Sequence, residues 1–313
     1  MLILEIILIV AGIAAVLYGA DFMTNGAVAL AKRMQIPEIV IGLTIVAIGT
    51  SAPELFVSIV SAINGTPDLA VGNVVGSNIF NTLLIAGASA VVAPIIITKE
   101  TVWRSLPIAA IASAMLIVFC LDKSISRTDA ILLFAGFLVF MFYTVRSAKN
   151  ADQAESENKD KQASGNISIW KPIGLIVLGL ALLIIGSNVF VDNASKLAAA
   201  LGVSEAVIGL TIVAGGTSLP ELATSVVAAH KGQSAMAIGN VLGSNIFNIL
   251  MILGIAGIIK PMNIVGITTI DLSVMLISII ILWLFSFTKL KVQRWEGAVL
   301  LIIFAGYMAW LLH

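Results

Sequence analysis

An 18-residue element that combines a proline, a glutamate and small polar residues occurs twice in this chain. Ile41 to Ser58 reads IGLTIVAIGTSAPELFVS and Ile208 to Ser225 reads IGLTIVAGGTSLPELATS, with identity at 14 of 18 positions. Each copy lies inside a long apolar run, where a helix break and a glutamate are tolerated only if their polar groups find partners within the protein. Both copies are therefore expected in the protein interior, with something to coordinate.

Composition places the chain in a membrane. Of its 313 residues 59% are hydrophobic and only 11% are charged, which is more apolar surface than a soluble domain buries. The first apolar run lacks a basic start and carries Glu5, so we interpret it as a span and not as a cleaved signal. The pattern predicts an all-α membrane protein with ten transmembrane helices, near residues 2–24, 38–62, 69–92, 103–121, 127–145, 172–194, 205–229, 236–259, 265–287 and 295–312.

The repeat extends over the whole chain. A second pair of segments at the same offset, Val71 to Gly87 and Ile238 to Gly254, is identical at 12 of 17 positions. Residues 1–146 and 171–313 then form two five-helix repeats, and the polar stretch 147–170 is predicted to be a flexible linker. Because five is odd, the two halves enter the membrane from opposite faces, and such inverted-topology repeats are typical of secondary transporters.

The positive charges predict the orientation. All but four of the 17 lysines and arginines fall in the loops after spans 1, 3, 5, 7 and 9, of which the loop after span 5 contains the linker. The positive-inside rule puts that side, with the linker, in the cytoplasm and both termini outside. We expect a multi-pass protein of the plasma membrane. The four residues on the opposite side are Lys123, Arg127, Lys196 and Lys260.

The two proline breaks supply candidate cation ligands. Pro53 and Pro220 each remove a backbone donor and clash with a carbonyl one turn back, so carbonyls from about Ala47 to Thr50 and from about Ala214 to Thr217 are expected to lose helical partners. Free carbonyls and the negative end of a half-helix dipole favour a cation. The side-chain oxygens that join them belong to Thr50, Ser51, Glu54, Thr217, Ser218 and Glu221.

The second repeated motif adds neutral oxygens. Ser77 and Asn81 are spaced i, i+4, as are Ser244 and Asn248, so each pair is expected on one helix face. Two carboxylates with carbonyl, hydroxyl and amide oxygens suit Ca²⁺ or Na⁺, since neither repeated motif contains a histidine or cysteine that would favour Zn²⁺ or Cu²⁺. We expect no catalytic residues, no resident cofactor and no nucleic-acid partner.

Structural explanations compete with ligand roles at several positions. Ser51 to Glu54 and Ser218 to Glu221 also fit the capping box S-x-x-E, which is compatible with coordination. The small-residue spacing G-x-x-x-G is explained equally well by close helix packing. Four asparagines either coordinate an ion or bond between helices: Asn73, Asn78, Asn240 and Asn245.

At these residues the chain closely resembles the Na⁺/Ca²⁺ exchangers of the cation/Ca²⁺ exchanger superfamily, particularly their compact prokaryotic members. The paired G-T-S-x-P-E and G-S-N-I-F-N elements resemble that superfamily's alpha repeats. The resemblance implies a core of spans 2, 3, 7 and 8, across which spans 1 and 6 slide as a gating pair. It implies central ligands at Glu54 and Glu221, with further ligands at Ala47, Thr50, Ser51, Ala214, Thr217, Ser218, Ser77, Asn81 and Ser244.

The sequence thus predicts a secondary active antiporter, not an enzyme, that exchanges Ca²⁺ for Na⁺ by alternating access. Some relatives carry an aspartate where this chain has Asn248, which makes a potassium requirement less expected here. An H⁺/Ca²⁺ antiporter, an exchanger of another divalent cation and a passive channel remain alternatives, although the G-N-A-x-E pattern of H⁺/Ca²⁺ exchangers is absent. A self-contained repeat pair surrounded by membrane lipid is expected to function as a monomer.

Overall fold

The computed structural model describes residues 2–156, 169–202 and 214–311. The helices and π-helical turns are, in chain order, α1 (Leu2–Met34), α2 (Glu38–Ile41), η1 (Gly42–Val46), α3 (Ala47–Thr50), α4 (Ala52–Asn64), α5 (Pro67–Ile79), η2 (Phe80–Ile85), α6 (Ala86–Val92), η3 (Thr101–Ser105), α7 (Leu106–Phe119), α8 (Arg127–Ser156), α9 (Trp170–Ala200), α11 (Ala214–Thr217), α12 (Leu219–His230), α13 (Ser234–Ile246), η5 (Phe247–Ile252), α14 (Leu253–Ile259), α15 (Thr269–Phe287) and α16 (Arg294–Leu311).

The helices confirm the predicted class. In the described part of the chain, eight helices are long and apolar enough to cross a membrane, and the pair Glu38–Thr50 and Ala52–Asn64, bent by 49°, makes a ninth if counted as one span. The predicted span 205–229 begins outside the described residues, and α11 and α12 are its described part. The protein is therefore an all-helical, multi-pass membrane protein.

Two helix segments, one from each repeat, form the buried centre. In Pro67–Val92 72% of the apolar window is buried and in Ser234–Ile259 78%, against 17% in Arg294–Leu311. Each buried segment contains a π-helical turn, η2 or η5, at repeat-related positions. Sequence periodicity did not predict these turns, which often occur at functional sites in other proteins.

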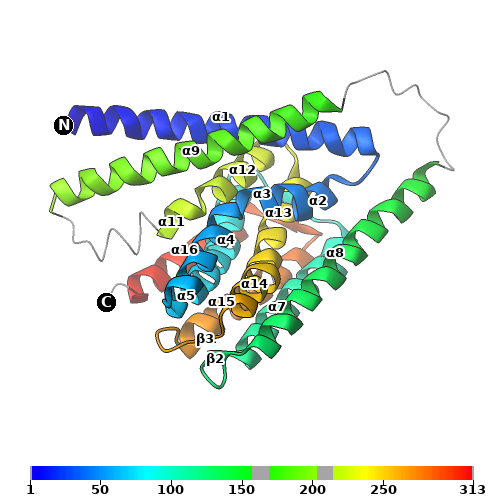
Figure 1. The fold of residues 1–313 in the computed structure, drawn as a ribbon. Coiled ribbons are helices and arrows are strands. Elements are labelled where there is room, and N and C mark those ends of the chain that lie inside the picture. The colour runs from blue at the N-terminus through cyan, green and yellow to red at the C-terminus, as the bar shows by residue number, and fades with distance from the viewer. Residues whose placement is uncertain (1, 157–168, 203–213, 312–313) are drawn as a thin grey trace.

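The long helices α1 and α9 lie side by side and antiparallel along one face of the bundle, across the direction of the helices below them (Figure 1). Glycines bring their backbones together. A Cβ atom added at Gly12 would lie 2.9 Å from the Gly186 carbonyl oxygen, and one at Gly19 would lie 2.8 Å from that of Gly179. A side chain at any of these positions would force the two helices apart.

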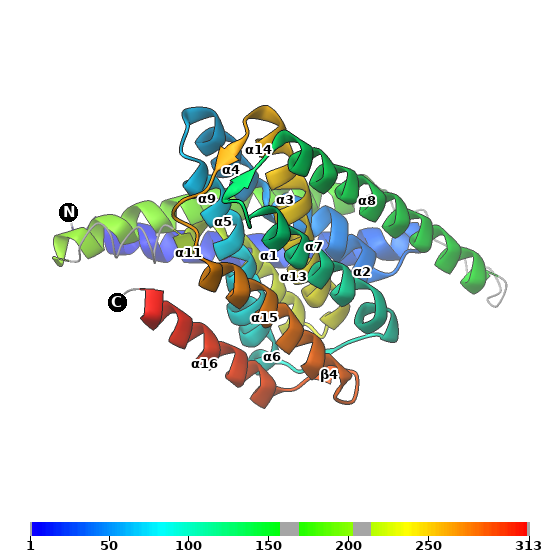
Figure 2. The ribbon, with the colours of Figure 1, turned by 90° about the horizontal axis from the view of Figure 1, so that it is seen from below.

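Two short antiparallel ladders join the repeats. The strands are β1 (Ile95–Ile96), β2 (Ser124–Ile125), β3 (Met262–Asn263) and β4 (Lys291–Val292). Strand β1 pairs with β4, and β2 pairs with β3. Each ladder thus takes one strand from each half. Strand β4 lies at one end of the bundle and the β2–β3 ladder lies at another (Figure 2).

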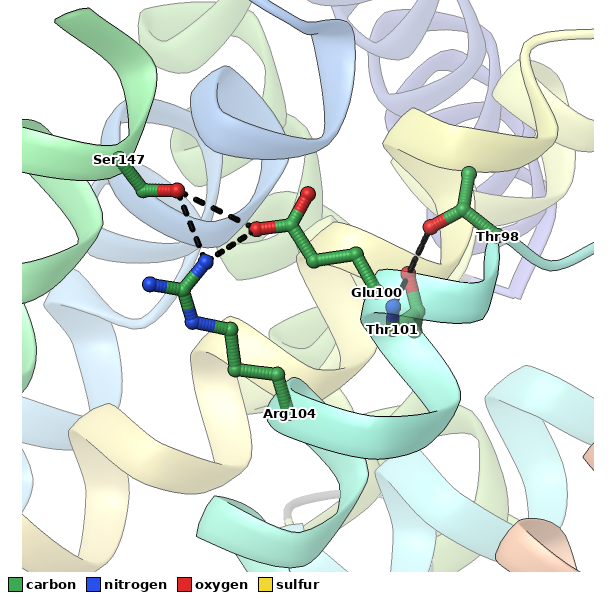
Figure 3. A network of polar contacts seen from close by, with 5 residues as sticks. All are labelled: Thr98, Glu100, Thr101, Arg104 and Ser147. Carbon is green, nitrogen blue, oxygen red and sulfur yellow. Dashed lines mark hydrogen bonds and ion pairs between the residues drawn. The ribbon is translucent and has the colours of Figure 1, made fainter. Parts of the chain in front are cut away.

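A polar network fastens α8 to the start of the η3–α7 helix (Figure 3). Arg104 forms an ion pair with Glu100 and donates to Ser147 Oγ at 2.8 Å, and Ser147 in turn donates to Glu100 at 3.2 Å. The guanidinium carbon of Arg104 also lies 3.8 Å from the centre of the Tyr143 ring. The network holds the end of α8 that leads to the predicted linker.

Candidate ion-binding site

The two repeated elements form two helix breaks of nearly the same geometry. Between α3 and α4, Ser51 has φ −82° and ψ 8°, and between α11 and α12, Ser218 has φ −90° and ψ 5°. A proline then occupies the first turn of α4 and of α12. Backbone N–H groups in the first turn of a helix have no partner within the helix, so a proline there costs no helical hydrogen bond. Both glutamates follow directly, so each lies in the first turn of its helix.

One expectation about the first break is wrong. Ala47 was predicted to lose the helical partner of its carbonyl, but Ser51 N–H donates to that oxygen at 2.9 Å. The reason is that Ser51 precedes Pro53 and keeps its own donor, and the carbonyl one turn before the proline is that of Gly49. The Gly49 carbonyl also keeps a partner, because a backbone N–H at the end of α3 donates to it. The Thr50 hydroxyl also lies 3.4 Å from the Ala47 carbonyl, but its single hydrogen has shorter contacts with the Val46 carbonyl and Asn240 Oδ1. When that hydrogen goes to either of them, the Ala47 carbonyl has one of its two lone pairs to offer to a cation.

The two glutamates meet through serines of the opposite repeat. Glu54 and Glu221 are each 1% exposed. Ser51 Oγ donates to Glu221 Oε1 at 3.0 Å, and Ser218 Oγ donates to Glu54 Oε1 at 3.2 Å. Neither serine side chain caps its own helix. The capping-box interpretation is therefore wrong here, because neither serine oxygen accepts a hydrogen bond from a backbone N–H group of its own helix.

Several buried oxygens at this meeting point accept no hydrogen bond. Burying an acceptor without a donor is costly, and a cation within reach removes that cost. The described residues contain no cluster of three histidine, cysteine or acidic side chains, so any cation here would have two carboxylates and otherwise neutral oxygens. The unsatisfied atoms are Glu54 Oε2, Glu221 Oε2, Asn81 Oδ1, Ser244 Oγ, Asn245 Oδ1 and Asn248 Oδ1.

The other predicted residues lie around this point. Ser77 and Thr50 are buried, and Ser218 Oγ is 3.4 Å from Ser77 Oγ. Thr217 ends α11 and is half-buried. Ala214 begins α11, but its side chain lies outside the described residues. The structure thus brings candidate oxygens from both repeats to one buried region, on the segments α3–α4, α5–η2, α11–α12 and α13–η5.

Two asparagines that the sequence left undecided hold the breaks in place. Asn73 Nδ2 donates to the Glu54 carbonyl at 3.2 Å, and Asn240 Nδ2 donates to the Glu221 carbonyl at 3.4 Å. Asn240 also accepts from the hydroxyl of Thr50, in the opposite repeat, at 3.2 Å. The one available signal was the G-N dipeptide, which recurs at the repeat offset without indicating a partner.

Comparison with known proteins decides the family. The chain matches the family described as "Sodium/calcium exchanger protein" at residues 4–146 and 171–313. It belongs to the sodium/calcium exchanger family. These exchangers are transporters and not enzymes, which confirms both the predicted resemblance and the predicted class of protein.

Similar proteins cover the exchanger from end to end. The inner membrane protein YrbG of Escherichia coli is 35% identical over 309 residues, which cover 97% of this chain and 94% of that one. The sodium/calcium exchanger MaX1 of Methanosarcina acetivorans is 32% identical, with 100% of both chains covered. A structure of the sodium-calcium exchanger NCX_Mj, soaked with zero Na⁺ and Ca²⁺, has a TM-score of 0.87 at 31% identity and covers 99% of this chain and 100% of its own.

In this exchanger the α1/α9 pair lies against both breaks. A Cβ atom at Gly49 would lie 3.4 Å from Met23 of α1, and one at Gly216 would overlap Val191 of α9 at 2.1 Å. Glycine at these two positions therefore lets the pair approach the breaks closely. The α1/α9 pair therefore packs directly against the two elements that carry the buried glutamates.

Helix α1 also contacts the residue that follows α12. Lys231 Nζ lies 2.5 Å from Asp21 Oδ1 of α1 and donates to Asn25 Oδ1 at 2.8 Å. Asn25 in turn donates to Asp21 Oδ2 at 3.0 Å. The lysine therefore bridges two acceptors one helical turn apart on α1.

Proposed function

We propose that this protein is a secondary active antiporter that exchanges Ca²⁺ for Na⁺ by alternating access. The observation that carries the proposal is the pair of buried glutamates, one from each inverted repeat. Ser51 and Ser218 each donate a hydrogen bond to the glutamate of the opposite repeat, and the second oxygen of each carboxylate accepts none. Oxygen-only sites with two carboxylates suit Ca²⁺ and Na⁺. The relative MaX1 is named a sodium/calcium exchanger, and NCX_Mj has been solved after soaking with Na⁺ and Ca²⁺.

The ligands divide by chemistry. In our proposal Glu54 and Glu221 are shared by whichever cation is bound, because they are the two negative charges at the centre. Neutral oxygens complete the shell on either side. These belong to the carbonyls of Ala47 and Ala214 and to the side chains of Thr50, Ser51, Thr217, Ser218, Ser77, Asn81, Ser244 and Asn248.

The same two carboxylates make exchange obligatory. Moving a bare carboxylate through an occluded, partly dehydrated state costs roughly several kcal/mol per ion, even after the surrounding protein relaxes. An empty carrier with both glutamates ionised therefore does not switch. Binding of Ca²⁺, or of Na⁺ ions in its place, compensates the pair and lets the gate move.

The orientation in the membrane follows from the charges. With the linker in the cytoplasm and both termini outside, the Lys231 contact with α1 lies on the cytoplasmic side of a plasma-membrane protein. YrbG is named an inner membrane protein. An H⁺/Ca²⁺ antiporter is the second candidate, because protons compete for the same two carboxylates, and an oxygen shell also accommodates other hard divalent cations.

The deciding experiment measures ⁴⁵Ca²⁺ uptake into proteoliposomes loaded with Na⁺, with K⁺, or with a proton gradient alone. We expect uptake only with internal Na⁺, and its loss in Glu54→Gln and in Glu221→Gln. Glu100→Gln, a matched substitution at a half-exposed glutamate outside the site, should retain uptake. Uptake without internal Na⁺ would instead indicate a channel, and uptake driven by the proton gradient would indicate the H⁺ antiporter.

A further inference from the structure

Asn78 on α5 joins the two repeats beside the site. Its side chain is 1% exposed. Its Nδ2 donates to the backbone carbonyl of Asn245 at 3.2 Å, and its Oδ1 accepts from Asn248 Nδ2 at 3.0 Å. Asn78 is absent from the ligand set proposed above, although it contacts a member of that set directly.

These two bonds fix the orientation of two amides in succession. A backbone carbonyl can only accept, so Asn78 must turn its NH₂ group toward Asn245 and its oxygen toward Asn248. An amide oxygen also only accepts, so Asn248 must turn its own NH₂ group toward Asn78. The oxygen of Asn248 is then left on the other side of its amide, buried and without a donor.

We propose that Asn78 is a positioning residue that makes Asn248 present an oxygen, and not an NH₂ group, to the transported cation. Rotation of the Asn248 amide by half a turn would place two N–H hydrogens where a cation must approach. Asn78 prevents this rotation because the rotated amide would set two oxygens against each other. The inference rests on the proposed function, since it requires that a cation binds at Asn248.

The repeat-related residue does not impose an orientation in this way. Asn245 Nδ2 donates to the hydroxyl of Thr82 at 2.8 Å. A hydroxyl can donate as well as accept, so it tolerates either orientation of the amide. Asn245 Oδ1 accepts no hydrogen bond and therefore does not hold Asn81 as Asn78 holds Asn248. The Asn78 contact thus acts on one side of a site that is otherwise built from matching halves.

A double-mutant cycle tests the inference. Apparent affinities for Ca²⁺ and for Na⁺ are measured on the reconstituted full chain for wild type, Asn78→Leu, Asn248→Ala and the double variant. We expect Asn78→Leu to weaken the affinity for at least one cation by about tenfold, as for other residues that orient a metal ligand. In the Asn248→Ala background the same substitution should change that affinity by less than about twofold.

A merely structural role gives a different result. If Asn78→Leu weakens binding equally with and without Asn248, or leaves both affinities unchanged, Asn78 does not act through Asn248 and the inference is overturned. Trp283→Phe is the matched control, because it removes a side-chain N–H bond to the carbonyl of Val102 on another helix. It should leave both affinities at the wild-type value. Asn78→Ser replaces Asn78→Leu in the same cycle if the leucine variant does not fold.

The outcome is separable from that of the proposed function. Absence of Na⁺-dependent Ca²⁺ uptake in the wild type would contradict Na⁺/Ca²⁺ exchange but not the positioning role of Asn78. The same four proteins are then compared by the rise of their unfolding temperature with added Ca²⁺, a measure of binding that needs no transport. A loss of this stabilisation in Asn78→Leu that is absent in the Asn248→Ala background supports the positioning role, and any other pattern overturns it.

Discussion

Ser51 donates a hydrogen bond to the carboxylate of Glu221 at 3.0 Å, although the two residues are 170 positions apart and belong to opposite repeats. The serine hydrogen is used on the carboxylate, so the lone pairs of Ser51 Oγ remain available to a cation. One short contact therefore orients a negative charge and a neutral ligand together. Ser218 and Glu54 repeat the arrangement at 3.2 Å.

Removal of Ser51 should weaken cation binding through Glu221. A hydrogen bond to a charged group contributes about 1.5–3 kcal/mol, so we expect Ser51→Ala to lower the apparent Ca²⁺ affinity at least about tenfold. The effect should shrink when Glu221 is already glutamine, because the partner charge is then gone. The rise of the unfolding temperature with added Ca²⁺ measures this in wild type, the two single variants and the double variant, because it reports binding without transport. Equal losses of affinity in both backgrounds would show that the contact is unimportant.

Acid should inhibit transport. Protons compete with cations for Glu54 and Glu221, and a protonated carboxyl neither compensates a cation nor needs one. As pH falls the protonated fraction grows, so the rate of Ca²⁺ uptake should fall and higher Ca²⁺ should restore part of it. The measurement is the initial rate of Ca²⁺ uptake between about pH 8 and about pH 5.5. Ordinary carboxyls titrate at pH values below this range. A flat profile would contradict competition at these glutamates.

Two repeat-related glycines should respond differently to substitution. A Cβ atom at Gly243 would lie 2.6 Å from the Cβ of Ala47, whereas at Gly76 no atom of the described residues lies within 4 Å. If the inverted repeats exchange conformations during transport, Gly76 must enter a contact like that of Gly243. We expect Gly76→Val to bind Ca²⁺ with near wild-type affinity but to stop exchange.

The test of this prediction separates binding from turnover. Ca²⁺-dependent thermal stabilisation reports binding, and ⁴⁵Ca²⁺ exchange reports turnover. Gly306→Val serves as the control, since Gly306 is exposed on α16 and no described atom lies within 4 Å of a Cβ there either. Full exchange activity in Gly76→Val would show that the space beside this glycine stays open in every state.

Much of this architecture could be predicted because the information is local or repeated. Apolar runs indicate the helices, and the offset between the two P-E elements pairs the residues that meet at the site. The identity of partners could not be predicted. The pattern S-x-x-E is the same whether the serine caps its own helix or reaches a glutamate in the other repeat, and only the fold distinguishes the two. The π-helical turn at Phe80–Ile85 was likewise invisible to periodicity, because it depends on packing between helices.

The contact between Lys231 and α1 should set the rate of gate movement more than the affinity for ions. The ion pair with Asp21 is partly exposed, with 26% of the lysine side chain and 41% of the aspartate side chain accessible. Ion pairs of this kind contribute at most about 1 kcal/mol, which corresponds to roughly a fivefold change in an equilibrium. We therefore expect Lys231→Met to change the exchange rate by up to about fivefold and to leave the apparent Ca²⁺ affinity within about twofold.

The effect should also depend on charge pairing rather than on the lysine alone. The swapped pair Asp21→Lys with Lys231→Asp should recover a rate close to wild type, and high salt should reduce the difference between wild type and Lys231→Met because ions screen exposed charges. Lys32→Met removes the same charge from the exposed end of α1 and should leave the rate unchanged. A Lys32→Met effect as large as that of Lys231→Met would mean that net charge near this face, and not the contact with α1, controls the rate.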